Sequence, residues 1–210
     1  MPDSADKTLR QGSTLKRAAI LDAARELFLS DGFDRTSVDA IAAHAGVSKR
    51  TVYDYFGDKQ TLLREVVIAA GETLMASVQA AIDQQLGEFD SLDAALVAFA
   101  ESVVGTTMDS PDYAALIRLV SAEAAQLSDL VASFGEEPED ALARRFAELD
   151  AEGLLVAPNP RLAADHFVAL TFQLTNPASS LGNRLERDQA ATRRRIEEGV
   201  AAFLRAYTRA

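Results

Sequence analysis

The amino-acid sequence predicts an all-α protein, with an N-terminal three-helix domain that contains a helix-turn-helix and a larger C-terminal helical domain. Apolar residues recur at three- and four-residue spacing along most of the 210-residue chain, as in amphipathic helices. Gly, Pro and Asn residues separate these stretches and favour turns. No stretch alternates as a β-strand does, and no internal repeat is present. We therefore expect helices throughout.

The N-terminal stretch divides into a polar tail and a first helix. Residues 1–12 predict a flexible tail. Ser13 or Thr14 is a suitable N-cap for a helix that extends to about Ser30. Gly32 then suits the left-handed conformation that ends many helices. The apolar side of this helix consists of Ile20, Ala24, Leu27 and Phe28.

Two short helices are predicted next, at residues 38–45 and 49–55, with a turn centred on Gly46. Ala42 is small enough for the two helices to cross closely, and Gly46 takes the positive φ of the turn. Val47 and Val52 supply apolar contacts, and Ser48 caps the second helix. The residues that build the motif are therefore Ala42, Gly46, Val47, Ser48 and Val52.

Further helices fill the rest of the chain. A long helix is predicted from Asp58 to Leu86, with apolar residues recurring on one side until Gly87 ends it. Turn-favouring residues follow each later helical stretch. The remaining helices are predicted at residues 91–108, 111–134, 138–152, 161–176 and 185–207.

The last two helices favour pairing between two copies of the chain. Apolar residues surround the helix at 162–174, and the helix at 185–207 has apolar residues at seven-residue spacing. Together they suit half of a four-helix dimer bundle, although they also suit covering their own core. The expected dimer residues are Phe167, Leu174, Leu185, Ile196, Val200, Phe203 and Tyr207.

Composition excludes several kinds of chemistry. The chain has no cysteine, which excludes disulfides and thiolate metal sites, and two histidines, which do not suggest zinc. No apolar run approaches the length of a membrane span, so we expect a cytoplasmic protein without a membrane partner. Lys and Arg balance Asp and Glu up to residue 70, at 10 against 10, but number 11 against 22 beyond it. The net charge of −11 therefore comes from the C-terminal part.

The motif between residues 36 and 62 resembles the DNA-binding segment of the tetracycline-repressor (TetR) family. The matching residues are Thr36, Ile41, Ala42, Ala45, Gly46, Val47, Ser48, Thr51, Val52, Tyr53, Phe56, Lys59 and Leu62. The resemblance is specific for about the first 65 residues. It implies a homodimer whose N-terminal domain, residues 13–60, binds double-stranded DNA. Residues 61–210 would form a ligand-binding and dimerisation domain.

Cations at the start of the second motif helix are the expected DNA contacts. Lys49 and Arg50 are our candidates for guanine edges, although either side chain can instead bind a phosphate. The resemblance assigns the phosphate contacts to Thr36, Ser37, Tyr53, Tyr55 and Lys59. Lys7, Arg10, Lys16 and Arg17 either stay solvated or form a basic arm that reaches the duplex. The acidic C-terminal part repels DNA, so binding is expected to depend strongly on salt.

The C-terminal domain contains residues suited to a small apolar ligand. Apolar walls with a few polar groups are the usual composition of such a site. The candidate pocket residues are Phe99, Val103, Met108, Tyr113, Leu116, Ile117, Phe134, His166, Leu170 and Gln173. Asp165 and His166 are adjacent on a helix and have no Ser or Cys nucleophile tied to them, so we expect no enzyme, and no cofactor or metal.

These observations favour a ligand-responsive, sequence-specific transcriptional regulator. We expect a repressor that a small apolar effector releases from an inverted-repeat operator. The alternative is a body that binds or converts a small molecule beside a DNA-binding head without sequence preference.

Overall fold

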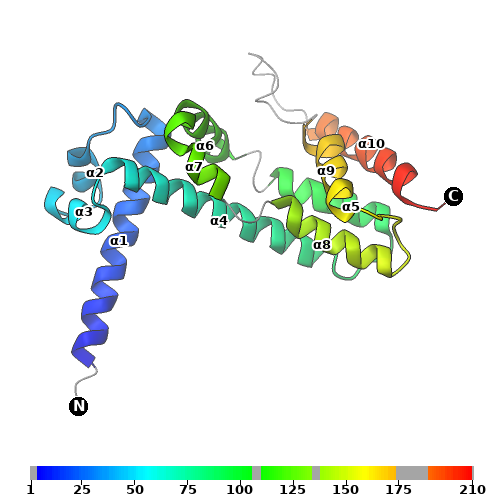
Figure 1. Ribbon diagram of the computed structural model, residues 1–210, viewed down its shortest axis with the longest axis horizontal. Helices are drawn as coiled ribbons and strands as arrows, with labels where there is room; N and C mark the ends of the chain where they lie inside the picture. Colours follow the sequence, from blue (N-terminus) through cyan, green and yellow to red (C-terminus); the bar gives the residue numbers. More distant parts are fainter. Residues whose placement is uncertain (1–3, 106–109, 134–137, 174–188, 210) are drawn as a thin grey trace. The chain divides into compact units, whose positions relative to one another are not determined.

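The computed structural model describes residues 4–105, 110–133, 138–173 and 189–209, and every regular element within these ranges is a helix (Figure 1). The chain forms two compact units. The first unit comprises Met1–Glu72 and Ala115–Ser133, and the second comprises Thr73–Ala114 and Phe134–Ala210. The first unit is therefore assembled from two stretches that are far apart in the sequence.

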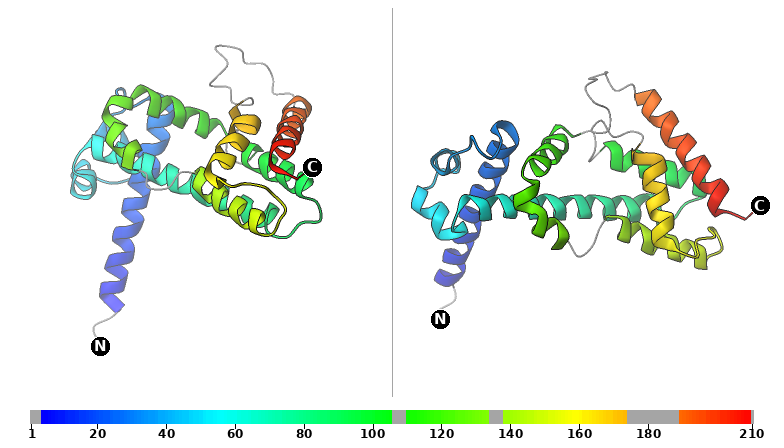
Figure 2. Two further views of the ribbon diagram at one scale, coloured as in Figure 1. Left: turned by 45° about the vertical axis from the view of Figure 1, so that its right-hand side comes forward. Right: turned by 45° about the horizontal axis from the view of Figure 1, so that its top comes forward.

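The first unit contains the three predicted N-terminal helices and two later ones. Its helices are α1 (Ser4–Asp31), α2 (Val38–His44), α3 (Lys49–Phe56), the first part of α4 (Lys59–Gln85), most of α6 (Pro111–Ala122) and α7 (Ala124–Ser133). Helices α6 and α7 lie beside α1 and the start of α4 (Figures 1 and 2). The single helix predicted at 111–134 is thus two helices, which meet at Glu123.

Helix α1 is longer than the sequence pattern indicated. It begins at Ser4, so the predicted flexible tail of residues 1–12 is wrong from that residue on. Its first turns extend beyond the other helices of the unit (Figure 1). Residues 4–11 include Ala, Lys, Leu, Arg and Gln, which favour helices, and no Pro. Gly12 costs the helix about 1 kcal/mol relative to Ala, which does not end it.

The core of the first unit joins α1, the helix-turn-helix, α4 and the later helices. Ile20 and Phe28 of α1 and Leu62 of α4 have at most 1% of their surface exposed. Leu119 of α6 and Leu127 of α7 are buried in the same cluster. Across the surface of this core the Gln60 amide donates to Gln126 Oε1 at 2.8 Å. The two compact units therefore do not divide the chain at residue 60. The predicted boundary there separates a DNA-binding from a ligand-binding domain, and it stays a prediction.

The second unit is also built from helices. It contains the end of α4, then α5 (Leu92–Val103), α8 (Pro138–Ala151), α9 (Pro160–Val168), a π-helix η2 (Ala169–Gln173) and α10 (Gln189–Tyr207). Helix α9 packs on α8, and α10 packs on α5, α9 and η2. The expected helix at 161–176 thus changes from α to π geometry at Ala169.

Aromatic side chains form the centre of the second unit. The ring of Phe167 lies edge-on to Phe146 at 5.7 Å and to Phe203 at 5.3 Å between centroids. Phe99 packs on the same ring at 5.9 Å. Tyr207 stacks on Phe203 at 4.6 Å and remains partly exposed. One cluster of rings therefore holds α5, α8, α9 and α10 together.

This core corrects most of the dimer assignment. Phe167, Ile196, Val200 and Phe203 have at most 1% of their surface exposed within a single chain, so they have no surface left for a partner. The apolar side chains around α9 and the seven-residue spacing in α10 reflect packing within one chain. Leu174 and Leu185, the other two apolar residues in the assignment, lie outside the described residues.

Helix α4 is the one helix in the described ranges that is long and apolar enough to cross a membrane, judged by length and composition alone. Core helices of soluble proteins pass the same test. Leu62, Leu63 and Val66 of α4 are buried in the first core, and Val78 and Ile82 are buried in the second. These side chains are already used in packing within the protein.

Gly199 allows α10 to approach the π-helix very closely. A Cβ atom at this position would lie 2.4 Å from the Leu170 carbonyl oxygen and 3.3 Å from Thr171 Cγ2. Thr171 is itself buried, and its hydroxyl donates to the Phe167 carbonyl at 2.7 Å. Because the clash would be with backbone, no rotamer change relieves it.

We expect Gly199→Ala to lower the free energy of unfolding by about 1–3 kcal/mol, the usual cost of overpacking. Urea unfolding followed by circular dichroism measures this change. Gly12→Ala is the matched control, because no atom lies within 4 Å of its added Cβ. The control should raise stability by about 0.4–1 kcal/mol. A neutral Gly199→Ala would show that α10 and η2 move apart at little cost.

Candidate nucleic-acid interface

The link between α1 and α2 is held by one buried hydroxyl. Gly32 ends α1 with φ +86°. Thr36 is 3% exposed, and its hydroxyl hydrogen lies between two acceptors, the Gly32 carbonyl at 2.8 Å and the Leu27 carbonyl at 3.1 Å. The hydroxyl is therefore used inside the protein, and the predicted phosphate contact stays a prediction.

Helix α2 and the turn after it follow the predicted geometry. Ser37 is the N-cap of α2, and its exposed hydroxyl accepts from the Ala40 N–H at 3.1 Å. At the other end Gly46 has φ +66°, and Val47 donates its N–H to the Ala42 carbonyl at 3.0 Å. This is the hydrogen bond of a Schellman ending, which favours glycine in the left-handed position. The positive φ predicted for Gly46 is confirmed, and the role of the small Ala42 side chain stays a prediction.

Helix α3 begins at the predicted cap and has one buried side. Ser48 accepts from the Thr51 N–H at 3.1 Å, as an N-cap does. Val52 and Phe56, 2% and 5% exposed, anchor the helix in the core. The exposed residues of the helix are Lys49, Arg50, Tyr53 and Asp54, and of these Arg50 and Asp54 stand opposite the buried side. A helix of eight residues with one exposed side fits a major groove about 12 Å wide.

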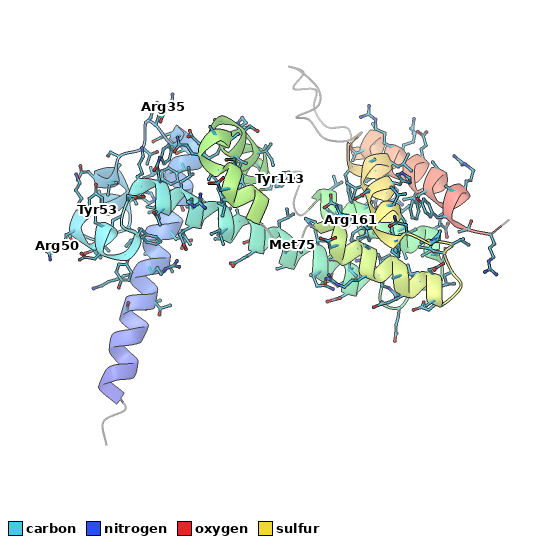
Figure 3. The ribbon with its side chains drawn as sticks, viewed as in Figure 1. Arg35, Arg50, Tyr53, Met75, Tyr113 and Arg161 are labelled. Carbon is cyan, nitrogen blue, oxygen red and sulfur yellow. The ribbon has the colours of Figure 1, made fainter. Side chains whose placement is uncertain are left out.

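The two cations predicted to contact bases differ in their partners. Lys49 Nζ donates to Asp39 Oδ2 of α2 at 2.9 Å, and this hydrogen bond and the Asp39 charge raise the pKa of Lys49. Arg50 Nε lies 3.8 Å from Asp54 Oδ2, beyond hydrogen-bond distance, and its side chain is 90% exposed. Figure 3 shows Arg50 extending from α3 into solvent. Arg50 therefore presents its donors to a ligand, whereas Lys49 already has a partner.

The two tyrosines of α3 also differ. Tyr53 is 44% exposed and stands on the same side of the helix as Arg50 (Figure 3). Tyr55 is half-buried, and its hydroxyl donates to Ser13 Oγ of α1 at 2.9 Å. Tyr53 is available to a phosphate in this arrangement, and Tyr55 links the end of α3 to α1.

Arg17 has a role that the sequence pattern did not reveal. Instead of belonging to a basic arm, its guanidinium bonds Glu65 of α4 and lies 5.2 Å from the centroid of the Phe56 ring. It thus connects α1, α3 and α4. The spacing along the chain does not show this link, because Arg17 and Glu65 are 48 residues apart.

Lys59 is committed to the same internal framework. Its ammonium group donates to the Phe33 carbonyl at 2.8 Å and to the Thr36 carbonyl at 3.0 Å, and lies 4.1 Å from the Phe33 ring centroid. The structure therefore gives this predicted phosphate contact a structural role, with one ammonium hydrogen left over. Asp58 caps α4 by accepting from the Thr61 N–H at 2.6 Å, and this bond lowers the pKa of the Asp58 carboxyl.

The ten predicted pocket residues are divided between the two compact units and the residues outside the described ranges. Phe99 and Val103 are buried in the second core, while Leu116 and Ile117 belong to the first unit. Met108, Phe134 and the side chain of Gln173 lie outside the described residues. Leu170 is partly buried and packs against the core of the second unit. The pocket stays a prediction.

Two polar residues among the predicted pocket residues, His166 and Tyr113, differ in their surroundings. His166 is exposed, and its Nδ1 shares a hydrogen bond of 2.7 Å with the Tyr207 hydroxyl. Burial, and then the Glu139 charge, raise the pKa of Tyr113 above its usual value. Tyr113 is therefore a neutral donor at physiological pH.

A separate cavity of about 260 Å³ lies within the second unit, between the end of α4 and α8. Ile82 and Leu86 line it from α4, and Arg144, Arg145 and Glu148 line it from α8. Arg145 donates to the Leu86 carbonyl at 2.7 Å and to Glu148 at 2.8 Å. None of the ten predicted pocket residues lines this cavity. Within the described ranges no three His, Asp or Glu side chains form a group that holds a metal.

A three-helix unit with two crossed short helices, a left-handed turn and an exposed second helix defines a helix-turn-helix DNA-binding protein. Residues 20–66 match the family described as "Bacterial regulatory proteins, tetR family". Residues 94–209, more than half of the chain, match the "AefR-like transcriptional repressor, C-terminal domain". The chain belongs to the TetR family of DNA-binding transcriptional regulators, which are not enzymes.

Solved structures of similar proteins agree with this assignment. A TetR-family regulator from Mesorhizobium loti superimposes with a TM-score of 0.86 and 29% identity, over 94% of this chain and 98% of that one. The flavonoid-responsive regulator FrrA is 31% identical over 92% of this chain and 97% of its own, with a TM-score of 0.67. The regulator AlkX of Mycobacterium tuberculosis is 32% identical over 75 residues, 36% of each chain. That match spans about a third of AlkX.

We expect Thr36→Val to lower the free energy of unfolding by about 1–3 kcal/mol, because a buried hydroxyl and its hydrogen bonds to the Gly32 and Leu27 carbonyls are lost. Chemical denaturation measures the change. Ser30→Ala is the matched control, since this exposed hydroxyl donates to the same Leu27 carbonyl at 3.4 Å and its loss should change stability by less than about 0.5 kcal/mol. Unchanged stability with an equally weakened affinity for all duplex sequences would instead support the predicted phosphate contact.

Proposed function

We propose that this protein is a ligand-responsive repressor that binds an inverted-repeat operator as a homodimer in the cytoplasm. The observation that carries the proposal is the exposed side of α3, where Arg50 is 90% and Tyr53 is 44% exposed while Val52 and Phe56 are buried. This helix enters the major groove, Arg50 reads a guanine edge, and Tyr53 binds a phosphate. Exposed Ser37, at the start of α2, supplies a second phosphate contact.

Dimerisation uses the exposed sides of α9 and α10 in place of their buried residues. Leu162 is a large apolar side chain that is 46% exposed, and it stands one turn before His166. Tyr207 hydrogen-bonds His166 from α10, so the two helices share this surface. Dimers are typical of the family. Two copies joined here present two α3 helices to one duplex.

Repression and its relief by an effector are supported by the relatives. The C-terminal match is to a domain described for a repressor, and FrrA is described as flavonoid-responsive. An effector that prefers one conformation of the C-terminal part weakens DNA binding by linkage. A coupling of about 1–3 kcal/mol corresponds to a change of about 5- to 150-fold in affinity. Helix α4 contributes residues to both units, which makes it the continuous element for such coupling.

Selection of bound fragments from a random duplex pool tests the proposed function. At about 0.15 M salt we expect an enriched inverted repeat whose half-sites are about 34 Å apart or a multiple of that distance, since each α3 occupies one major groove. Sequencing of the bound fraction and the mass of the complex give the site and the stoichiometry. A folded dimer that enriches no sequence would contradict sequence-specific regulation.

We expect Arg50→Ala to relax the preference at one position of each half-site and to cost about 1–3 kcal/mol on the operator, because it removes a bidentate guanine contact. Fluorescence anisotropy with the operator and single-base variants measures both effects. Arg118→Ala is the control, as this exposed arginine of α6 belongs to the same unit and is not part of α3. An equal loss on all DNA sequences would make Arg50 a phosphate contact.

A further inference from the structure

We propose that Asp54 is a specificity-determining residue that accepts a hydrogen bond from a cytosine amino group in the major groove, next to the guanine read by Arg50. The proposal rests on the proposed function, because it requires α3 to occupy the groove. It assigns a recognition role to a carboxylate on the DNA-facing side of the protein.

The position of Asp54 places its carboxylate among the groups that face the groove. It follows Arg50 by four residues on α3, and both stand opposite the buried side formed by Val52 and Phe56. The Asp54 side chain is 64% exposed, and Tyr53 stands beside it. Four residues of helix rise by about 6 Å, and successive base pairs are about 3.4 Å apart. Arg50 and Asp54 therefore reach base pairs one or two steps apart.

A carboxylate at this position is unfavourable against phosphates, so its partner on DNA must be a donor. The major groove offers two kinds of donor, the N4 amino group of cytosine and the N6 amino group of adenine. Asp pairs with the cytosine amino group, whereas Asn suits adenine because it accepts from N6 and donates to N7. The side chains of Arg50 and Asp54 are thus suited to contact a guanine and a cytosine at neighbouring positions of the duplex.

The charge of Arg50 makes this contact feasible. Its Nε lies 3.8 Å from Asp54 Oδ2, so the pair enters the groove with no net charge. This separation is too long for a hydrogen bond, and nothing else in the described part of the chain donates to Asp54. Both carboxylate oxygens remain available to a base.

Asp39 shows the contrasting use of a carboxylate in the same unit. Its Oδ2 accepts from Lys49 Nζ at 2.9 Å, so it holds a cation of the neighbouring helix. Asp54 stands on α3 itself and makes no such bond within the described ranges. Of the two acidic side chains, Asp54 is therefore the one whose acceptors are directed to a ligand.

This role predicts that the Asp54 carboxylate affects the affinity for the operator and the affinity for random duplex differently. The Asp54 charge repels phosphates on every sequence, so it lowers the affinity for random duplex. On the operator the cytosine contact offsets that repulsion. Asp54 thereby raises the ratio of operator to random affinity, which is the quantity that determines occupancy among competing sites.

Sequence selection with four proteins tests the proposal: the natural chain, Asp54→Ala, Asp54→Asn and the control Asp22→Asn. Asp22 is an exposed carboxylate on α1 of the same unit, so the control removes the same charge away from α3. Each protein is selected on one random duplex pool at the same salt concentration. Anisotropy with the selected site and with random duplex then gives the two affinities, and circular dichroism checks that each variant is folded.

We expect the natural chain to select a cytosine one or two positions from a guanine in each half-site. Asp54→Ala should lose the cytosine preference, a change of about 5- to 150-fold between bases at that position, and bind random duplex more tightly. Asp54→Asn should shift the preference toward adenine. The control should leave the selected sequence unchanged.

An Asp54→Ala variant that selects the same sequence as the natural chain would overturn the proposal, even though the protein remains a sequence-specific regulator. A tighter binding to all duplexes with an unchanged preference would mean that Asp54 acts by charge alone and would also overturn it. Absence of any selected sequence with the natural chain would instead refute the proposed function. The two failures are therefore distinguished by the natural chain itself.

Discussion

Burial of Phe56 and Val52 is the interaction on which the DNA-facing surface depends. These two side chains set the rotation of α3, so they decide that Arg50, Tyr53 and Asp54 face outward. Because α3 has only eight residues, it cannot be stable alone and takes its position from the core of α1, α4 and α7. Arg17 adds a cation over the Phe56 ring and a bond to Glu65, which ties the same helix to both long neighbours.

Polar groups near this helix serve two different purposes. The Thr36 hydroxyl and the Lys59 ammonium group satisfy carbonyls between α1 and α2, where an unpaired buried group would be costly. Lys49 is held by Asp39 across the two motif helices. The groups with exposed atoms and weak internal partners include Arg50 and Asp54. Side chains with internal partners therefore hold the fold together, whereas exposed side chains with weak partners are the candidates for recognition, whatever their residue type.

In the second unit, aromatic packing and one small residue determine the arrangement. Phe146, Phe167 and Phe203 fill the centre, and Gly199 lets α10 meet the π-helix at the Leu170 carbonyl. The side chains that look like a dimer seam in the sequence are consumed by this core. The proposed dimer therefore uses the outer sides of α9 and α10 in place of their buried side chains.

The sequence by itself determined the local structure of this protein: the helical class, the caps at Ser37 and Ser48, the turn at Gly46 and the membership of the motif in its family. These features depend on residues close together in the chain, and backbone conformation and helix periodicity express them directly. Only the tertiary structure decided that α6 and α7 complete the first core, that Thr36 and Lys59 are internal, and that Phe167 and Phe203 are buried. Those outcomes depend on which residues distant in sequence meet, and an apolar periodicity is the same whether its partner is the same chain or another copy.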